Sequence, residues 1–286
     1  MSQSRELTLH IAQMEEIRSI LNAMKNLALI EIHKLTRFQT MQGQAVAAIE
    51  QAALDFLDFH RLPAVDETPL SIGILIGAER GFCGDFNESL INTVAADGYA
   101  GIIAIGSRLC SRLEDSPLSI IAAIEGANAS EEVPTILNRL IDAIATLSAG
   151  GDISRPANAK AIHAAATLQL TAVYHDNRSG QINRRQILPP FPQQPQRTAR
   201  YGNPPVLNFA PAEFLADLTD HYLFAALHEI FYLSLMTENQ RRLQHLEGAI
   251  KHLDDETVNL RRKSQIYRQE EITEEIEVIL LNAENL

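Results

Sequence analysis

Cysteine and basic residues are scarce in this sequence. Only Cys83 and Cys110 occur among 286 residues, too few for a disulfide framework or a zinc site built from thiolates, and typical of a reducing compartment. Lys and Arg number 24 against 36 Asp and Glu, which gives a formal net charge of −12. A general nucleic-acid binder needs a basic face to displace phosphate counterions. The composition therefore argues against nucleic acid as a partner.

Long apolar runs are missing as well. No stretch approaches the roughly 20 residues that cross a bilayer, so we expect no direct insertion into a membrane. The first ten residues, MSQSRELTLH, resemble neither a signal peptide nor a transit peptide. Hydrophobic residues make up 46% of the chain, enough to bury a sizeable core. These features predict a soluble, acidic protein of the bacterial cytoplasm.

Helix-breaking residues are almost absent from both ends of the chain. Eleven of the 12 prolines lie between Pro63 and Pro205, and 12 of the 14 glycines lie between Gly73 and Gly202. Breakers cost most inside helices, so each end can form an uninterrupted helix. The sequence thus predicts three segments: a helix in 1–62, a domain in 63–210 and a helix in 211–286.

Both end segments carry heptad-like apolar rows. The first row is apolar at seven of eight positions: Leu7, Met14, Leu21, Ala28, Leu35, Gln42, Ile49 and Phe56. A companion row three residues later begins His10, Ile17, Met24 and runs to Ala52. The other end repeats Leu243, Leu246, Ile250, Leu253, Leu260 and Tyr267, with interruptions at Thr257 and Ser264. This spacing predicts an antiparallel coiled coil of the two ends; a buried face in a helical bundle is the alternative.

The middle segment alternates short apolar runs with helical stretches. We expect strands at residues 71–78, 101–106, 117–123, 167–175 and 181–188. Helices are expected at 85–96, 107–114 and 131–147. Alternation of this kind predicts a mostly parallel sheet, giving a central Rossmann-like α/β domain.

No motif in the sequence assembles an active site. Between Gly77 and Gly81 there are three residues, where a dinucleotide fingerprint allows one, and there is no P-loop. The pair His228-Glu229 lacks the second histidine of a zinc motif. Cys83 has no histidine near it in sequence, so we expect a buried, unreactive thiol in a strand-to-helix turn. We expect no catalytic residue, cofactor or metal.

Motifs spread over nearly the whole chain resemble the gamma subunit of F-type ATP synthases. In chain order they are I-L-N-A-M-K at 20–25, E-R-G-F-C-G-D-F-N at 79–87, P-V-L-N-F-A-P at 205–211, E-N-Q-R-R at 238–242 and R-Q-E-E-I-T-E-E-I at 268–276. The resemblance implies a non-catalytic rotor shaft at the cytoplasmic side of the bacterial inner membrane, coupling ion flow to ATP synthesis or hydrolysis. It implies a hexamer of alpha and beta subunits, an epsilon subunit and a c-ring as partners.

The same resemblance implies residues that contact the alpha/beta hexamer. In the C-terminal motif these are Arg268, Gln269 and Thr273, and on the facing helix Met24, expected beside the same collar, with Lys25. Intrahelical pairs of Arg268 with Glu271 or Glu275 are the alternative for that side chain.

Several positions depart from the family pattern, including acidic residues at Glu270, Glu271 and Glu274. These departures favour a divergent branch, such as the alternative synthases, and leave proton and sodium coupling both open. A freestanding coiled-coil scaffold with an α/β body is the alternative function. A nicotinamide-dependent enzyme is disfavoured by the glycine spacing.

Overall fold

The computed structural model describes residues 3–60, 69–148, 168–191 and 201–284. By their contacts these residues form two compact units, Met1–Leu29 with Arg242–Leu286, and Ile30–Arg241. Two long helices, α1 (Gln3–Leu57) and α5 (Pro211–Glu284), each contribute to both units. The helical ends and the α/β middle are confirmed, whereas the three-segment division remains a prediction. None of the described helices is long and apolar enough to cross a membrane.

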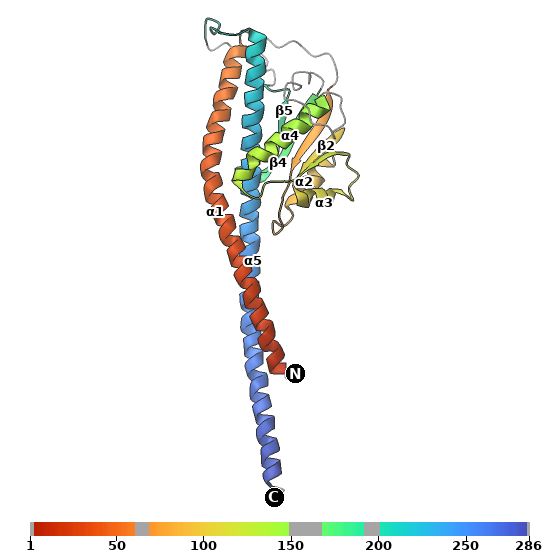
Figure 1. Ribbon diagram of the computed structural model, residues 1–286, viewed down its shortest axis with the longest axis vertical. Coiled ribbons are helices and arrows are strands. Elements are labelled where there is room, and N and C mark those ends of the chain that lie inside the picture. Colours follow the sequence, from red (N-terminus) through yellow and green to blue (C-terminus); the bar gives the residue numbers. More distant parts are fainter. Residues whose placement is uncertain (1–2, 61–68, 149–167, 192–200, 285–286) are drawn as a thin grey trace. The chain divides into compact units, whose positions relative to one another are not determined.

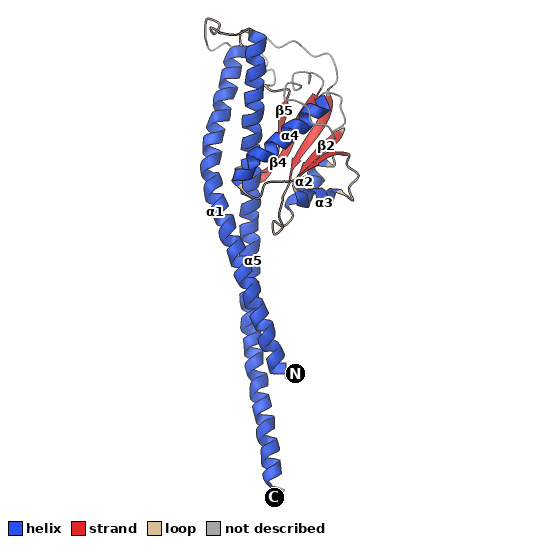
Figure 2. Cartoon of the chain, viewed as in Figure 1, coloured by secondary structure: helices blue, strands red, loops and turns tan. Residues whose placement is uncertain are grey.

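The second unit contains a five-stranded sheet in the order β3-β2-β1-β4-β5 (Figures 1 and 2). Its strands are β1 (Leu70–Ile76), β2 (Gly101–Ile105), β3 (Ile120–Ile124), β4 (Leu168–Asp176) and β5 (Gln181–Leu188). The first four run parallel and β5 is antiparallel to β4. The predicted strands and the mostly parallel sheet are thereby confirmed.

Helices cover both faces of this sheet. On β1, Ile72, Ile74 and Ile76 belong to a buried cluster with α4 (Val133–Ser148) and the second-unit parts of α1 and α5. The opposite face packs Leu75 against α2 (Phe86–Val94) and α3 (Ser107–Leu113). Alternate residues of a strand point to opposite faces, so one short apolar strand supports two separate helical layers.

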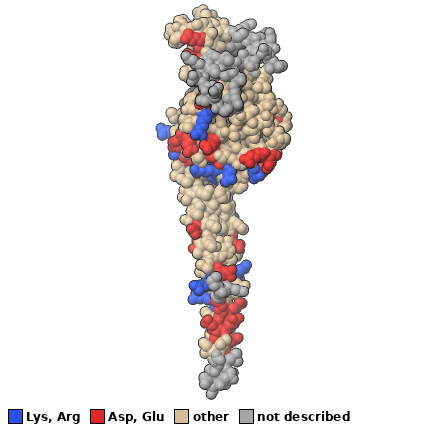
Figure 3. Space-filling model, turned by 45° about the vertical axis from the view of Figure 1, so that its right-hand side comes forward, with Lys and Arg blue, Asp and Glu red and all other residues tan. Residues whose placement is uncertain are grey.

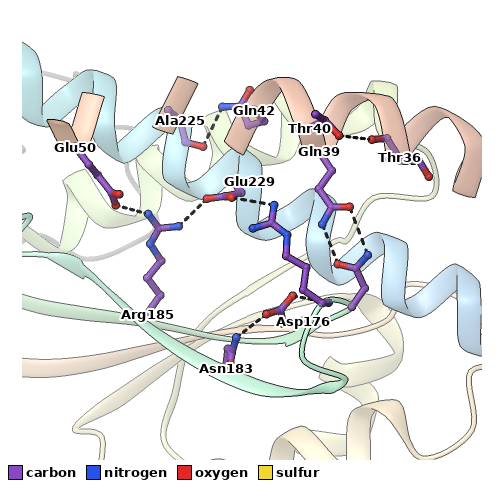
Figure 4. Close-up of polar contacts among 12 residues, drawn as sticks. Thr36, Gln39, Thr40, Gln42, Glu50, Asp176, Asn183, Arg185, Ala225 and Glu229 are labelled. Carbon is purple, nitrogen blue, oxygen red and sulfur yellow. Dashed lines mark hydrogen bonds and ion pairs between the residues drawn. The ribbon is translucent and has the colours of Figure 1, made fainter. Parts of the chain in front are cut away.

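A buried polar cluster fixes the helical pair to β5 in the second unit (Figure 4). Arg185 on β5 donates to Glu50 of α1 at 2.7 Å and to Glu229 of α5 at 2.8 Å. The Glu229 side chain is 8% exposed and also pairs with Arg178 at 3.4 Å. A buried carboxylate needs such paired charges. A Cβ at Gly43 would lie 3.3 Å from Glu229 Oε1, so the side chains of this cluster approach the α1 backbone closely at this glycine.

In the first unit α1 and α5 pair antiparallel around a small apolar core. Leu21, Leu246 and Ile250 are buried together, and Met24 and Leu253 pack against them half-buried. Ion pairs cross between the helices from Arg18 to Asp254 and from Glu15 to Arg261. In the second unit the same antiparallel direction is marked by the ring contact of Phe56 with Phe214. The predicted helix pairing is confirmed.

The first heptad row is confirmed, but its companion row is wrong. Every residue of the row from Leu7 to Phe56 is buried or half-buried. Ile17 is 48% exposed, however, and Ala45 and Ala52 are also exposed. The second buried row lies four residues after the first, at Ile11, Ile32, Gln39, Val46 and Ala53. In the second unit α1 packs on the sheet as well as on α5, and this turns its buried face toward the i+4 positions.

Candidate partner-binding site

The last part of α5 presents apolar side chains that α1 does not cover. Among the described residues the ion pair between the helices that lies nearest the start of α1 joins Glu15 to Arg261, and α5 continues past the start of α1 to Glu284 (Figure 1). The spacing predicted Tyr267 as a core residue, but it is 37% exposed. Thr257 and Ser264, which interrupt the apolar row, are buried and half-buried. Exposed apolar residues from here on are Ile266, Tyr267, Ile272, Ile276, Val278, Ile279 and Leu280. We call these residues the apolar end of α5.

Charge changes sign along the same stretch. A basic group that includes Arg261 and Arg268 precedes an acidic run that includes Glu270, Glu271 and Glu274. Figure 3 shows basic side chains gathered beside a group of acidic ones towards the end of α5. The exposed surface here is therefore both apolar and strongly acidic.

Three predicted contact residues lie on this stretch with their side chains exposed: Arg268, Gln269 and Thr273. The Thr273 hydroxyl donates to the Gln269 carbonyl at 2.8 Å. Within the described residues no ion pair joins Arg268 to Glu271 or Glu275. The Arg268 guanidinium thus presents its hydrogen-bond donors to solvent.

The other two predicted contact residues, Met24 and Lys25, are half-buried on α1. Met24 packs on the Leu21, Leu246 and Ile250 core of the first unit. Ile250 precedes Arg268 by 18 residues, which corresponds to about 27 Å along a helix. The expectation that Met24 lies beside the same collar as Arg268 is therefore wrong, because the antiparallel register places it further up the pair.

The loop after β1 is closed by its own polar residues. Asn87 accepts a hydrogen bond from the Ala78 amide at 2.9 Å. Glu79 accepts from the Ser107 amide and hydroxyl at 2.8 and 2.7 Å and from the Gly126 amide at 2.6 Å. Burial alone would raise the pKa of Glu79, but these hydrogen bonds lower it below its ordinary value. The loop ends of three neighbouring strands are thus tied to one carboxylate.

Residues of α5 fill the carboxyl end of the sheet, a role that the sequence did not reveal. Ser234 donates to the Ile76 carbonyl of β1 at 3.2 Å. The Thr237 hydroxyl, 2.9 Å from the Leu233 carbonyl of its own helix, also lies 3.3 Å from the His175 carbonyl of β4. Arg241 pairs with Asp85 at 2.6 Å, at the start of α2. The sequence signal for these contacts was the presence of hydroxyl side chains in an otherwise apolar helical stretch. In doubly wound folds ligands bind at this edge; here these α5 side chains cover it.

Cys83 lies in the same loop and is 5% exposed, as predicted, with its thiol 3.5 Å from the Arg80 carbonyl. Gly84, which follows it, has a φ of +64°, a conformation suited to glycine. Within the described residues no group of three or more His, Cys, Asp or Glu side chains could hold a metal ion.

We expect the Cys83 thiol to react with N-ethylmaleimide far more slowly in the native Cys110→Ala variant than in the same variant unfolded. Burial of the sulfur blocks reagent access, so protection should reach about 100-fold or more. The rate of thiol loss under native and denaturing conditions measures it. Equal rates would contradict the buried placement.

Comparisons with known proteins agree on one family. The family model described as ATP synthase matches residues 3–286. The ATP synthase gamma chain of Clostridium beijerinckii is 24% identical over 216 residues, which are 72% of this chain and 69% of the relative.

Solved structures share the fold. The rotor of the Euglena gracilis mitochondrial ATP synthase matches with a TM-score of 0.59 at 12% identity, over 94% of this chain and 98% of that chain. The central stalk and c-ring structure from the Tetrahymena thermophila mitochondrial enzyme gives 0.54 at 16%, over 80% and 99%. The family model and the curated relative together carry the assignment: the chain belongs to the gamma-subunit family of the ATP synthases.

Proposed function

We propose that this chain is the central shaft of a rotary ATP synthase and itself carries out no bond chemistry. The observation that carries the proposal is the apolar end of α5, which lies beyond its ion pair with α1 and exposes half or more of residues such as Ile276 and Ile279. An exposed apolar surface of this kind marks an interaction site. A freestanding scaffold is not favoured, since the family model covers nearly the whole chain.

The proposed partners follow from the family and from the printed descriptions of the neighbours. The apolar end of α5 would enter a hexamer of alpha and beta subunits. The α/β unit would face the membrane sector, since the Tetrahymena neighbour is described as central stalk and c-ring. An epsilon subunit would accompany it, and the complex would lie on the cytoplasmic side of a bacterial inner membrane.

Coupling in this proposal is mechanical. Exposed and half-buried side chains, Arg268, Gln269 and Thr273 on α5 with Met24 and Lys25 on α1, would contact loops of the surrounding subunits. One asymmetric shaft contacts equivalent catalytic sites differently, so turning it changes their affinities in sequence. A conformational change is driven only by such differential contact.

The double variant Arg268→Ala with Gln269→Ala tests the proposal. A hydrogen bond to a charged group is worth about 1.5–3 kcal/mol, so ATP hydrolysis by the reconstituted complex should fall about tenfold. Both side chains are exposed, so the isolated chain should keep its circular dichroism spectrum and melting temperature.

The matched control is Gln244→Ala with His245→Ala, two exposed neighbours on the paired part of α5 in the same unit. It should hydrolyse ATP at the unaltered rate. Full activity of the Arg268 and Gln269 variant, or failure of the chain to assemble with alpha and beta subunits, would contradict the proposed function.

A further inference from the structure

One guanidinium joins the sheet to both long helices in the Ile30–Arg241 unit. Arg185 of β5 donates from Nη1 to Glu229 of α5 at 2.8 Å and from Nη2 to Glu50 of α1 at 2.7 Å (Figure 4). Its Nη2 also lies 3.5 Å from the Tyr222 hydroxyl of α5. The planar guanidinium holds its donors in fixed directions, whereas a lysine offers a point charge on a flexible stem. We call Arg185, Glu50, Glu229 and Tyr222 the arginine joint.

The arginine joint is largely closed to water. The side chains of Glu229 and Arg185 are 8% and 23% exposed, and Tyr222 is buried with its ring centre 5.8 Å from the guanidinium. Only Glu50, with 43% of its side chain exposed, lies at an open edge. Charge pairs that are buried in this way are screened little by solvent or salt. The joint therefore keeps strong interactions in fixed directions.

The apolar contacts around the joint have no such directions. Ile74 of β1 lies in one buried cluster with Leu227 and Ile230 of α5. A small sliding movement leaves the buried apolar area nearly unchanged, so the hydrophobic effect opposes it little. A hydrogen bond weakens steeply when its atoms move apart by about 1 Å, and fixing a register is the best attested use of buried polar groups. The cluster thus holds the layers together, while the joint sets their position.

We infer that Arg185 is a positioning residue for torque, which fixes the sheet against the helical pair so that turning one turns the other. This inference rests on the proposed function, because in that function force passes between the sheet and α5 in either direction of rotation. Such force acts along the contact between the layers, where the apolar cluster resists least. Without the guanidinium the sheet shifts on the helices under load, and ATP hydrolysed during the shift moves no ion.

The double variant Arg185→Met with Glu229→Gln removes the joint without leaving an unpaired buried charge. Replacing a buried ion pair by neutral groups of similar size is often neutral for stability, so the isolated chain should melt within about 4 °C of the unaltered protein. Arg184→Met is the matched control. Arg184 is the neighbouring arginine of β5, and it bonds to the Thr93 carbonyl of α2 at 3.1 Å and to Asp97 at 2.7 Å. Within the described residues it forms no hydrogen bond or ion pair with α1 or α5.

Ion pumping under load, compared with ATP hydrolysis without load, measures the effect. Each complex, assembled from all its subunits, is placed in vesicles, and an oxonol dye follows the membrane potential, which proton and sodium pumping both generate. Valinomycin with potassium on both sides removes this potential and with it the load. The double variant should then hydrolyse ATP at the unaltered rate. Its steady potential without valinomycin should fall about twofold or more, because each lost hydrogen bond to a charged group shifts an equilibrium about tenfold or more. Arg184→Met should match the unaltered complex in both measurements.

An unaltered potential in the double variant would overturn the inference, and the proposed function would stand, since that complex still couples. A proportional fall of hydrolysis and potential would also overturn it, because the defect would then lie outside the joint. Should the double variant fail to fold, Glu50→Ala decides. This side chain is 43% exposed, so the fold should be kept while the bond to α1 is lost, and a potential equal to that of Arg184→Met would refute the inference. Absence of pumping by the unaltered complex would instead contradict the proposed function.

Discussion

Replacing Leu246 by Asp should unpair α1 and α5 in the first unit. Leu246 is fully buried and packs with Leu21 and Ile250, the other two buried members of that core in the described residues. Losing the buried leucine costs about 2–5 kcal/mol, and a carboxylate left without a partner adds several kcal/mol more. So small an interface has little to offset this loss.

Limited proteolysis measures the effect, because an unpaired helix frays and is cut. New cleavage is expected in residues 3–29 and 242–280, together with reduced helical circular dichroism at 222 nm. Val258→Asp is the control, since Val258 is 63% exposed on the same part of α5, and it should change stability by less than about 0.5 kcal/mol. Unchanged cleavage and melting of the Leu246→Asp variant would show that the pairing is not needed.

The two long helices could be predicted because their signal is local: glycine and proline are almost absent from both ends of the chain. Gly43 and Gly248 are the only glycines inside them, and Pro211 stands at the first position of α5, where proline is tolerated. The strands were equally visible, since short apolar runs lie between turn residues. Both signals depend only on neighbouring residues, and the fold class is confirmed.

Which residues of α1 are buried could not be predicted, because the helix packs against α5 on one side and against the sheet on another. A heptad row assumes one partner helix, whereas Val46 and Ala53 are buried in the cluster that also contains sheet residues. Thr257 was read as an interruption but is 7% exposed at a core position. Its hydroxyl lies 3.9 Å from the Met14 sulfur across the pair, a contact that no single-helix pattern contains.

The candidate site also contains features that the sequence predicted and features that it did not. Arg268, Gln269 and Thr273 were found through a local motif, and the exposure of their side chains keeps the proposed contact available. The covering of the sheet edge by Ser234 and Thr237 was missed, because it joins residues more than 60 positions apart in sequence. Such contacts depend on the register between elements that are distant in sequence, which no local motif gives. The expected position of Met24 beside Arg268 was wrong for the same reason.

His175 stands where β4, α2 and α5 meet, and its chemistry makes this junction sensitive to acid. The residue is 2% exposed, with Nε2 2.8 Å from the Phe86 carbonyl and its ring 4.0 Å from that of Phe86. Burial lowers the pKa of His175 from its ordinary value of 6.5 to about 4, and the Arg241 charge acts in the same direction. The Phe86 hydrogen bond and Asp85 oppose the shift only in part.

The sign of the effect follows from the proton balance. Below pH 6.5 the unfolded chain binds a proton on this imidazole, while the folded chain stays neutral until about pH 4. Folding stability from His175 is therefore complete above pH 6.5 and is lost as the pH falls from 6.5 to 4. Between pH 7.5 and 4.5 the loss of folding stability from this one group is about 2–3 kcal/mol.

Urea unfolding at pH 7.5 and 4.5 isolates this contribution when His175→Gln is compared with the unaltered chain. Glutamine keeps a donor for the Phe86 carbonyl but does not titrate, so the variant should lose about 2–3 kcal/mol less stability on acidification. His33→Gln is the control, because His33 is exposed on α1 in the same unit, and it should follow the unaltered chain. Since the Thr237 hydroxyl of α5 lies 3.3 Å from the His175 carbonyl, acid should release α5 from the sheet edge first. Increased hydrogen exchange of residues 231–241 at pH 4.5, suppressed in His175→Gln, would show this release; equal pH dependence of all three proteins would refute it.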